Sequence, residues 1–417
     1  MPSKATAPAI ERRDHLTHRG NCKHTRYGWL RLTPAFSVHL IRDLVEALPV
    51  GASVLDPFCG TGTTALVCAD EGVYCETSDI NPFLLWLASA KTAHYSAAEI
   101  EEARTAAARV SRELSTGNGH APWLPPLFQI EKWWDPPILR ELGRTRAFIE
   151  DESKTISSRG LNLLKISFCR SMIELANVSF GHQSMSFKQP DGHGQMELVL
   201  STNQTELVAR KWREATDSII KAAQSSLKAS PRCVHCDARN LTSGLQRDFF
   251  DCVITSPPYP NRMSYIRELR PYMYWLGYLE DARKAGELDW EAIGGTWGCA
   301  TSNLSKWEPP EREIPFSGFS SILNRISKSS SLLSRYVHKY FCDMTLHVRE
   351  LSHVVKPGGS IHYIVGNSKF YDVLLPVEQI FASMFEEVGF TQVKSTVIRK
   401  RTSKRELFEY DVTGRKP

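Results

Sequence analysis

The chain has 417 residues, and at roughly 150 residues per domain this length predicts two or three domains, or one large domain with insertions. Apolar residues make up 42% and charged residues 23% of it, which is ordinary globular usage and excludes disordered, collagen-like and low-complexity classes. The 51 Lys and Arg against 46 Asp and Glu give a net charge of +5, which permits a polyanionic partner without requiring one.

Targeting signals and cysteine usage indicate the cellular compartment of the protein. The N-terminal segment has no apolar signal core, and no later stretch is long and apolar enough to span a bilayer. Cys233 and Cys236 have the spacing of half a zinc site, but no second pair follows, so we interpret them as strand cysteines and predict no metal. The ten cysteines are scattered, several within apolar runs. We expect a cytoplasmic protein without disulfides and without membrane contact.

The N-terminal third begins with strands and helices in alternation. Residues 52–56 predict a short buried strand, 57–62 a turn, 63–71 a helix and 73–79 a second strand. Two strands joined by one helix imply a parallel pair with a right-handed crossover.

The rest of the chain continues this pattern around two interruptions. Residues 92–230 read as mostly helical, and 280–330 as a polar stretch rich in Trp and Gly. Strands are expected at 232–235, 249–255 and 360–365, and helices at 263–279 and around 336–351, with a turn at 356–359. The alternation in 389–412 predicts two antiparallel strands. The fold class is therefore α/β, a mostly parallel sheet with an antiparallel C-terminal hairpin.

Two segments about two hundred residues apart carry the chemistry. The first, Asp56-Pro57-Phe58-Cys59-Gly60-Thr61-Gly62-Thr63-Thr64, lies between a predicted strand and helix, where glycines let the backbone approach a ligand. It has neither the Gly-Lys-Ser/Thr of a P-loop nor the third glycine of the dinucleotide fingerprint, so a diphosphate cofactor is disfavoured. Asp79 ends the next strand and is placed to accept hydrogen bonds from a ribose diol. Asp237 is a third acid at a strand end.

The second segment is Thr255-Ser256-Pro257-Pro258-Tyr259, at the end of an apolar strand. Two prolines stop the strand and hold the backbone extended. A hydroxyl, carbonyl acceptors and an aromatic face are what is needed to hold the amino group and ring of a nucleobase. Pro-Pro alone would indicate only a strand terminator.

Together these segments resemble the amino-group DNA methyltransferases that use S-adenosylmethionine. Asp56 to Gly62 looks like their motif I, and Ser256-Pro257-Pro258-Tyr259 like their motif IV, whose Ser form is associated mainly with cytosine N4. The resemblance implies a Rossmann-like class I methyltransferase sheet with helical insertions. It also implies double-stranded DNA as substrate, and leaves open a cognate restriction endonuclease or defence-system subunit and the oligomeric state.

The resemblance also assigns roles to residues. Ser256, Pro257, Pro258 and Tyr259 would be catalytic, with Ser256 and the Pro257 carbonyl accepting hydrogen bonds from the amine and Tyr259 stacking on a base flipped from the duplex. The cofactor would be bound by Thr33, Pro34, Asp56, Pro57, Phe58, Cys59, Gly60, Gly62, Thr63, Asp79, Ile80, Asn81, Asp237 and Ala238.

The resemblance also divides the chain into parts of a core and two insertions. We expect a cofactor-binding half of the core at 1–93, a helical insertion at 94–230, the catalytic half at 231–281, a second insertion at 282–335 that could contact DNA, and the end of the core at 336–417. Either insertion could read the target sequence.

Basic and aromatic residues suggest where DNA could lie. Arg262, Tyr265, Arg267 and Arg270 follow the second segment on a predicted helix and could line a DNA channel, or form a solvated basic face. A second basic group, Arg399, Lys400, Arg401, Lys404 and Arg405, lies at the terminal hairpin turn, where a solvated turn is favoured over a phosphate clamp.

Three other functions stay open at this point: adenine N6 methylation of DNA, methylation of an RNA base, and a DNA-binding subunit that has lost catalysis. Cytosine C5 methylation is disfavoured, because the Pro-Cys dipeptide of those enzymes does not occur here.

Overall fold

The computed structural model describes residues 21, 25–30, 32, 37–116, 120–179, 186–187, 204–261, 264–296, 299–311, 313–401 and 406–417. Three residues predicted to act in the site, Thr33, Pro34 and Arg262, lie outside the described residues. Within the described ranges, no helix combines the length and the apolar character needed to cross a membrane.

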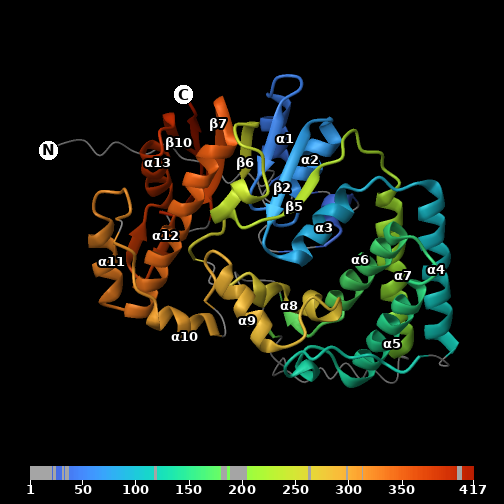
Figure 1. Cartoon of the computed structure of the whole chain (residues 1–417). Helices are drawn as coiled ribbons and strands as arrows, with labels where there is room; N and C mark the ends of the chain where they lie inside the picture. Colours follow the sequence, from blue (N-terminus) through green and yellow to red (C-terminus); the bar gives the residue numbers. More distant parts are fainter. Residues whose placement is uncertain are drawn as a thin grey trace.

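A seven-stranded sheet in the order β10-β11-β7-β6-β1-β2-β5 forms the centre of the molecule (Figure 1). Its strands are β1 (Ser53–Asp56), β2 (Tyr74–Asp79), β5 (Arg232–His235), β6 (Phe250–Thr255), β7 (Val355–Gly366), β10 (Thr391–Lys400) and β11 (Phe408–Arg415). The ladders joining β5, β2, β1, β6 and β7 are parallel, and β11 runs antiparallel to both β7 and β10. This confirms the predicted fold class, and places the antiparallel strand inside the sheet, next to the edge strand β10.

The segment expected to be a turn before β7 differs from the prediction. Lys356 to Gly359 belongs to β7, where the ladder with β6 shifts register between Phe250 and Cys252. Gly358 has a φ of +79° and its amide donates to the Lys416 carbonyl, so the C-terminal end of the chain extends the ladder around an irregular strand start.

Helices cover both faces of the sheet, and successive residues of a strand pack against opposite layers. Val54 packs with helices α1 (Val38–Glu46) and α2 (Thr63–Glu71), whereas the next residue, Leu55, packs in the opposite core with α12 (Ser331–Val354). Such strands, covered on both faces, are read in sequence as short continuous apolar runs.

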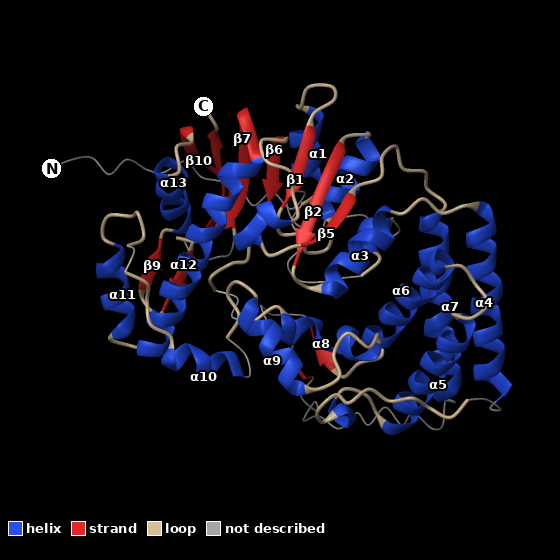
Figure 2. Cartoon of the chain, viewed as in Figure 1, coloured by secondary structure: helices blue, strands red, loops and turns tan. Residues whose placement is uncertain are grey.

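The predicted helical insertion is a bundle beside the sheet, and Figure 2 shows that helices dominate this side of the molecule. Its helices are α4 (Ala97–Thr116), α5 (Pro136–Glu152), α6 (Ser158–Glu174) and α7 (Gln204–Ala223), with η4 (Ile130–Lys132) and the short strands β3 (Val178–Ser179) and β4 (Ser186–Phe187). The bundle shares one core with α3 (Pro82–Thr92) and α8 (Ile266–Trp275). Since α8 comes from the predicted catalytic half, the bundle and that half are packed together.

The stretch read as polar and rich in Trp and Gly contains helices. They are α9 (Ala282–Glu291), α10 (Cys299–Lys306) and α11 (Phe319–Ser327). The remaining elements are η3 (Arg26–Gly28), η5 (Ala238–Ser243), α13 (Val377–Glu387) and the hairpin of β8 (Ser368–Phe370) and β9 (Val373–Leu375).

One buried guanidinium joins the bundle to the sheet-bound helix α3. Arg26, 3% exposed, donates hydrogen bonds to carbonyls in the last turns of α3 and α7 and just after them. The five acceptors are the carbonyls of Lys91, Ala93, Ala222, Ala223 and Ser225, at 2.6 to 3.4 Å. The last carbonyls of a helix have no partner inside it, so Arg26 caps two helices at once.

We predict that Arg26→Leu lowers the free energy of unfolding by about 3 kcal/mol or more, because it leaves several buried carbonyls without a donor. Urea unfolding followed by circular dichroism measures the change. Arg213→Leu on α7 is the matched control, since the Arg213–Glu206 pair is exposed and should contribute less than about 1 kcal/mol. Equal losses in the two variants would refute the capping role.

Candidate cofactor and base-binding site

The functional residues meet where the parallel strands end. Asp56 of β1 pairs with Thr77 of β2, and Asp79 of β2 pairs with His235 of β5. On the other side of β1, Leu55 pairs with Val253 of β6. The loops after β1, β2, β5 and β6 therefore leave the sheet at one edge, next to the strand where the chain changes direction of winding, which is where open α/β sheets bind ligands.

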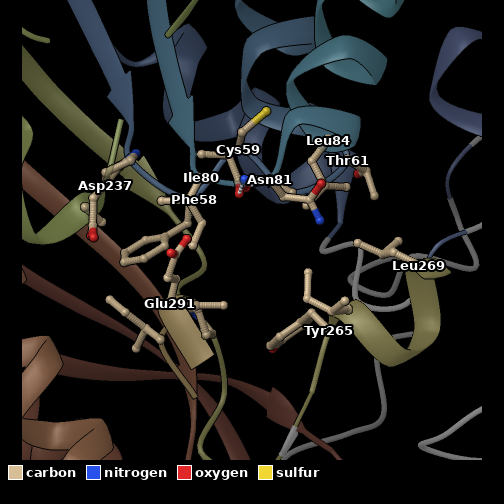
Figure 3. Close-up of a pocket in the computed structure, with 18 of the residues that line it drawn as sticks. Phe58, Cys59, Thr61, Ile80, Asn81, Leu84, Asp237, Tyr265, Leu269 and Glu291 are labelled. Atoms are coloured by element: carbon tan, nitrogen blue, oxygen red, sulfur yellow. Dashed lines mark hydrogen bonds between the residues drawn. The ribbon is translucent and has the colours of Figure 1, made fainter. Parts of the chain in front are cut away.

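A pocket of about 1030 Å³, counting its open mouth, occupies this edge (Figure 3). Of the residues predicted from sequence, it is lined by Pro57, Phe58, Cys59, Gly60, Asp79, Ile80, Asn81, Asp237, Ala238, Ser256, Pro258 and Tyr265. The lining also includes residues that the sequence did not single out as site residues: Leu32, Thr61, Leu84, Cys236, Ile266, Leu269, Glu291, Ala292 and Ile293. None of these described lining residues is basic, whereas Asp79, Asp237 and Glu291 are acidic.

The glycine-rich turn after β1 is fixed by contacts to the neighbouring strand. The amide of Cys59 donates to the carbonyl of Ser78 at 2.9 Å, and the amide of Gly60 donates to Oδ2 of Asp79 at 3.3 Å. Gly62, with a φ of +73°, begins α2 so close to α3 that an added Cβ would lie 2.9 Å from Cβ of Ala88. A glycine is therefore required here both by backbone conformation and by space.

A buried lysine supports the same turn. Nζ of Lys91 donates to the carbonyl of Thr61 at 2.9 Å, and burial lowers the pKa of this amine to about 8. The contact spans thirty positions of sequence, so no local motif could have indicated it.

The three predicted acids have different surroundings. Asp56 is fully buried outside the pocket lining, where it accepts from Oγ1 of Thr255 at 2.6 Å, and burial raises its pKa to about 7. Asp79 faces the pocket, accepts from the amide of Asn81 at 2.9 Å, and has a pKa raised by burial to about 6. Asp56 thus braces β1 against β6, while the carboxylate of Asp79 faces the pocket.

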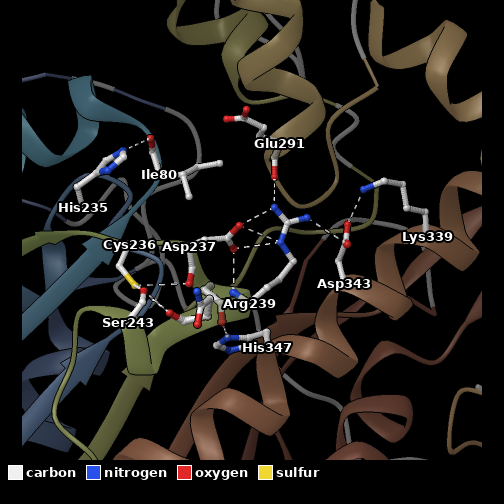
Figure 4. Close-up of polar contacts among 12 residues, drawn as sticks. Ile80, His235, Cys236, Asp237, Arg239, Ser243, Glu291, Lys339, Asp343 and His347 are labelled. Atoms are coloured by element: carbon white, nitrogen blue, oxygen red, sulfur yellow. Dashed lines mark hydrogen bonds and ion pairs between the residues drawn. The ribbon is translucent and has the colours of Figure 1, made fainter. Parts of the chain in front are cut away.

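Asp237 is held ionised by Arg239 (Figure 4). Burial acts to raise the pKa of Asp237, but hydrogen bonds and an ion pair of 2.7 Å with Arg239 hold the pKa below its usual value. The same guanidinium contacts Asp343 of α12 at 3.2 Å and donates to the Glu291 carbonyl at the end of α9 at 2.6 Å. Arg239 therefore ties three elements around the pocket, and α9, which begins the predicted second insertion, forms part of the pocket wall.

The Ser256–Tyr259 loop is held from several sides. Oγ of Ser256 donates to the carbonyl of Ile364 on β7 at 3.1 Å. Tyr259 is 7% exposed, its hydroxyl donates to Oε1 of Glu409 at 3.1 Å, and the guanidinium of Arg401 covers one face of its ring at 5.0 Å. Pro257 and Tyr259 are not among the residues that line the pocket.

The residues predicted to line a DNA channel lie in different surroundings. Tyr265 lines the pocket, and Arg267 is exposed. Arg270 turns toward the helical bundle, where its guanidinium lies over the ring of Trp133 at 5.1 Å. In the terminal hairpin, Arg399 pairs with Glu409 at 2.6 Å and the Arg401 guanidinium lies over the Tyr259 ring. Lys404 and Arg405, at the predicted turn, lie outside the described residues.

Three other residues predicted to bind the cofactor do not line the pocket: Asp56, Gly62 and Thr63. Among the described residues, no group of three or more His, Cys, Asp or Glu side chains could hold a metal ion.

No protein-family model matches the chain. Curated proteins similar to it are named Type II methyltransferases and align over nearly its whole length. M.BsoBI of Geobacillus stearothermophilus is 22% identical and covers 93% of this chain and 82% of its own. M.MvaI of Kocuria varians (90% and 83%) and M.AvaI of Nostoc sp. (92% and 83%) are also 22% identical.

Among solved structures, the rRNA methyltransferase aviRa from Streptomyces viridochromogenes aligns over 93% of this chain and 87% of its own, at 12% identity. Its TM-score is 0.28, which is too low to indicate a shared fold. The chain is similar in sequence to Type II methyltransferases over about nine-tenths of its length. Its central sheet is of the predicted α/β class.

Proposed function

We propose that the protein is a site-specific DNA methyltransferase that transfers a methyl group from S-adenosylmethionine to the exocyclic amine of a flipped base, cytosine N4. The similarity to Type II methyltransferases supports methyl transfer. The single observation that carries the choice of an amine is the hydrogen-bonding state of Ser256 at the pocket wall.

A hydroxyl has one hydrogen and two lone pairs. Ser256 has two neighbours for its one hydrogen, the Ile364 carbonyl at 3.1 Å and the Tyr259 hydroxyl at 3.5 Å. Because the carbonyl is nearer and can only accept, Ser256 donates to it, and its lone pairs remain available to accept from a substrate N–H. The pocket side of this loop therefore presents acceptors, which suit an amino group. Accepting both amine hydrogens, at Ser256 and at the Pro257 carbonyl, favours a pyramidal nitrogen whose lone pair can attack.

The pocket fits the proposed methyl donor in charge and in shape. S-adenosylmethionine supplies an electrophilic methyl group on a positively charged sulfur. A described lining with three carboxylates and no basic residue favours a cationic ligand with hydroxyls over a phosphate-bearing one. Asp79 is placed to accept from ribose hydroxyls, Asp237 from the adenine amine, and Ile80 to contact the adenine ring.

Tyr259 keeps its proposed role of stacking on the flipped base. Arg401 already covers one face of the ring, so the base would use the other face. Glu409 and Arg401 would hold the ring still, which lowers the entropic cost of ordering it when the base enters.

The proposal is tested by incubating the purified protein with labelled S-adenosylmethionine and duplex DNA, and then identifying the methylated nucleoside by mass spectrometry. We expect N4-methylcytosine. N6-methyladenine would overturn the choice of base, transfer to tRNA alone would reassign the substrate, and no transfer together with no cofactor binding by calorimetry would leave a non-catalytic role.

We predict that Ser256→Ala lowers turnover by about 100-fold or more, because the variant lacks one acceptor for the amine. Cofactor affinity, measured by calorimetry, should stay within about twofold, since the hydroxyl is not assigned to cofactor binding. The control is Ser327→Ala, an exposed serine on α11 that bonds its own helix. Full activity of Ser256→Ala would show that the assignment is wrong.

We also predict that cofactor affinity rises by up to about tenfold between pH 5 and pH 7, because Asp79, with a pKa of about 6, must ionise to accept strongly. Asp79→Asn should bind more weakly and without this pH dependence. Asp237→Asn should instead weaken binding while leaving the pH dependence in place, because the pKa of Asp237 is held below its usual value. Affinity that is flat with pH in the unmodified protein would exclude Asp79 as this acceptor.

A further inference from the structure

We propose that two tyrosine hydroxyls outside the Ser256–Tyr259 segment, those of Tyr265 and Tyr340, position this loop for transfer to the substrate amine. The inference rests on the proposed function and extends it to two positioning residues. Neither has a place in the two motifs, and they come from different helices, α8 and α12.

Tyr340 holds the carbonyl of Pro258. Its side chain lies inside the core on α12, 1% exposed, and its hydroxyl donates to the Pro258 carbonyl at 2.6 Å. Burial raises the pKa of Tyr340 well above the usual value, so the hydroxyl keeps its proton and remains a donor. Removing this donor would leave a part-buried carbonyl without that partner.

Tyr265 holds the next group along the loop, the amide of Tyr259. The amide donates to the Tyr265 hydroxyl at 3.0 Å, and Tyr265 itself lines the pocket at the start of α8. The neighbouring Ser264 donates to the buried carboxylate of Asp289 on α9, which fixes the approach to this helix. The position of Tyr265 is thus set by α9 as well as by α8.

The two prolines explain why such side-chain contacts are needed. Pro257 and Pro258 have no N–H, so the loop has few backbone groups with which to anchor itself. The tyrosines engage the Pro258 carbonyl and the Tyr259 amide. With these two groups fixed, the tyrosines set the orientation of the loop's peptide groups, including that of the Pro257 carbonyl proposed to accept from the amine.

The chain contains a matched control on the same helix. Tyr336 lies one turn before Tyr340 on α12, is 3% exposed, and its buried hydroxyl has no hydrogen-bond partner within the described part of the chain. Tyr336→Phe therefore removes a buried hydroxyl of the same kind from the same core, but one that makes no hydrogen bond to the loop. It separates the loss of a hydroxyl from the loss of the contact to Pro258.

The experiment compares Tyr340→Phe, Tyr265→Phe and Tyr336→Phe in the full chain, with duplex DNA and labelled S-adenosylmethionine. We expect the single-turnover methyl-transfer rate to fall by about 10- to 100-fold in the first two variants, as for a small misplacement of a reacting group. Cofactor affinity by calorimetry and the KM for DNA should change by less than about threefold, so that the loss falls on kcat. Tyr336→Phe should transfer at the rate of the unmodified protein.

The inference is overturned if Tyr340→Phe and Tyr265→Phe transfer at the unmodified rate, or if Tyr336→Phe loses as much as Tyr340→Phe, which would indicate general damage to the core. It is also overturned if the losses fall on cofactor or DNA affinity instead of kcat. Failure of the unmodified protein to transfer methyl groups would instead defeat the proposed function, so the two failures are distinguishable.

Discussion

The parallel pairing of β1 with β2 on one side and with β6 on the other is the constraint on which the site depends. It makes the strands end at one edge, although Asp56 and Ser256 are two hundred positions apart in sequence. Thr255, the last residue of β6, then hydrogen-bonds Asp56 at 2.6 Å. The glycine-rich turn and the Ser256–Tyr259 loop are consequently neighbours because of sheet register, before any ligand is present.

Arg239 extends this arrangement from the sheet to the helices that cover it. A half-buried carboxylate at the pocket edge is costly unless it is paired. Arg239 pairs Asp237 while also contacting Asp343 and the Glu291 carbonyl. The helix α9 that forms part of the wall is therefore held by the same group that keeps Asp237 ionised. One side chain thus sets both the charge state of Asp237 and the position of α9 at the pocket.

The strand ends were predictable from sequence because each carries local signals: β2 was expected at 73–79 and lies at Tyr74–Asp79, and α2 was expected where it lies. Side chains that reach the site from distant elements were not predictable from sequence. Glu291, Tyr340 and Lys91 act through contacts across long sequence separations, and an isolated Tyr or Lys on an amphipathic helix is typical of any core or surface. The helices of the 282–335 region were missed because Gly and Trp obscured their periodicity.

The direction of one hydrogen bond links the terminal strands to the proposed chemistry. A serine can donate or accept, unlike a carboxylate, which only accepts when ionised. In this loop the choice is made by the Ile364 carbonyl, which lies on β7 and is fixed there by the ladder with β11. The same strand β11 carries Glu409, the acceptor for the Tyr259 hydroxyl. The antiparallel strand inserted beside β7 therefore does more than complete the sheet, because it orients both polar side chains of the loop toward the roles proposed for them.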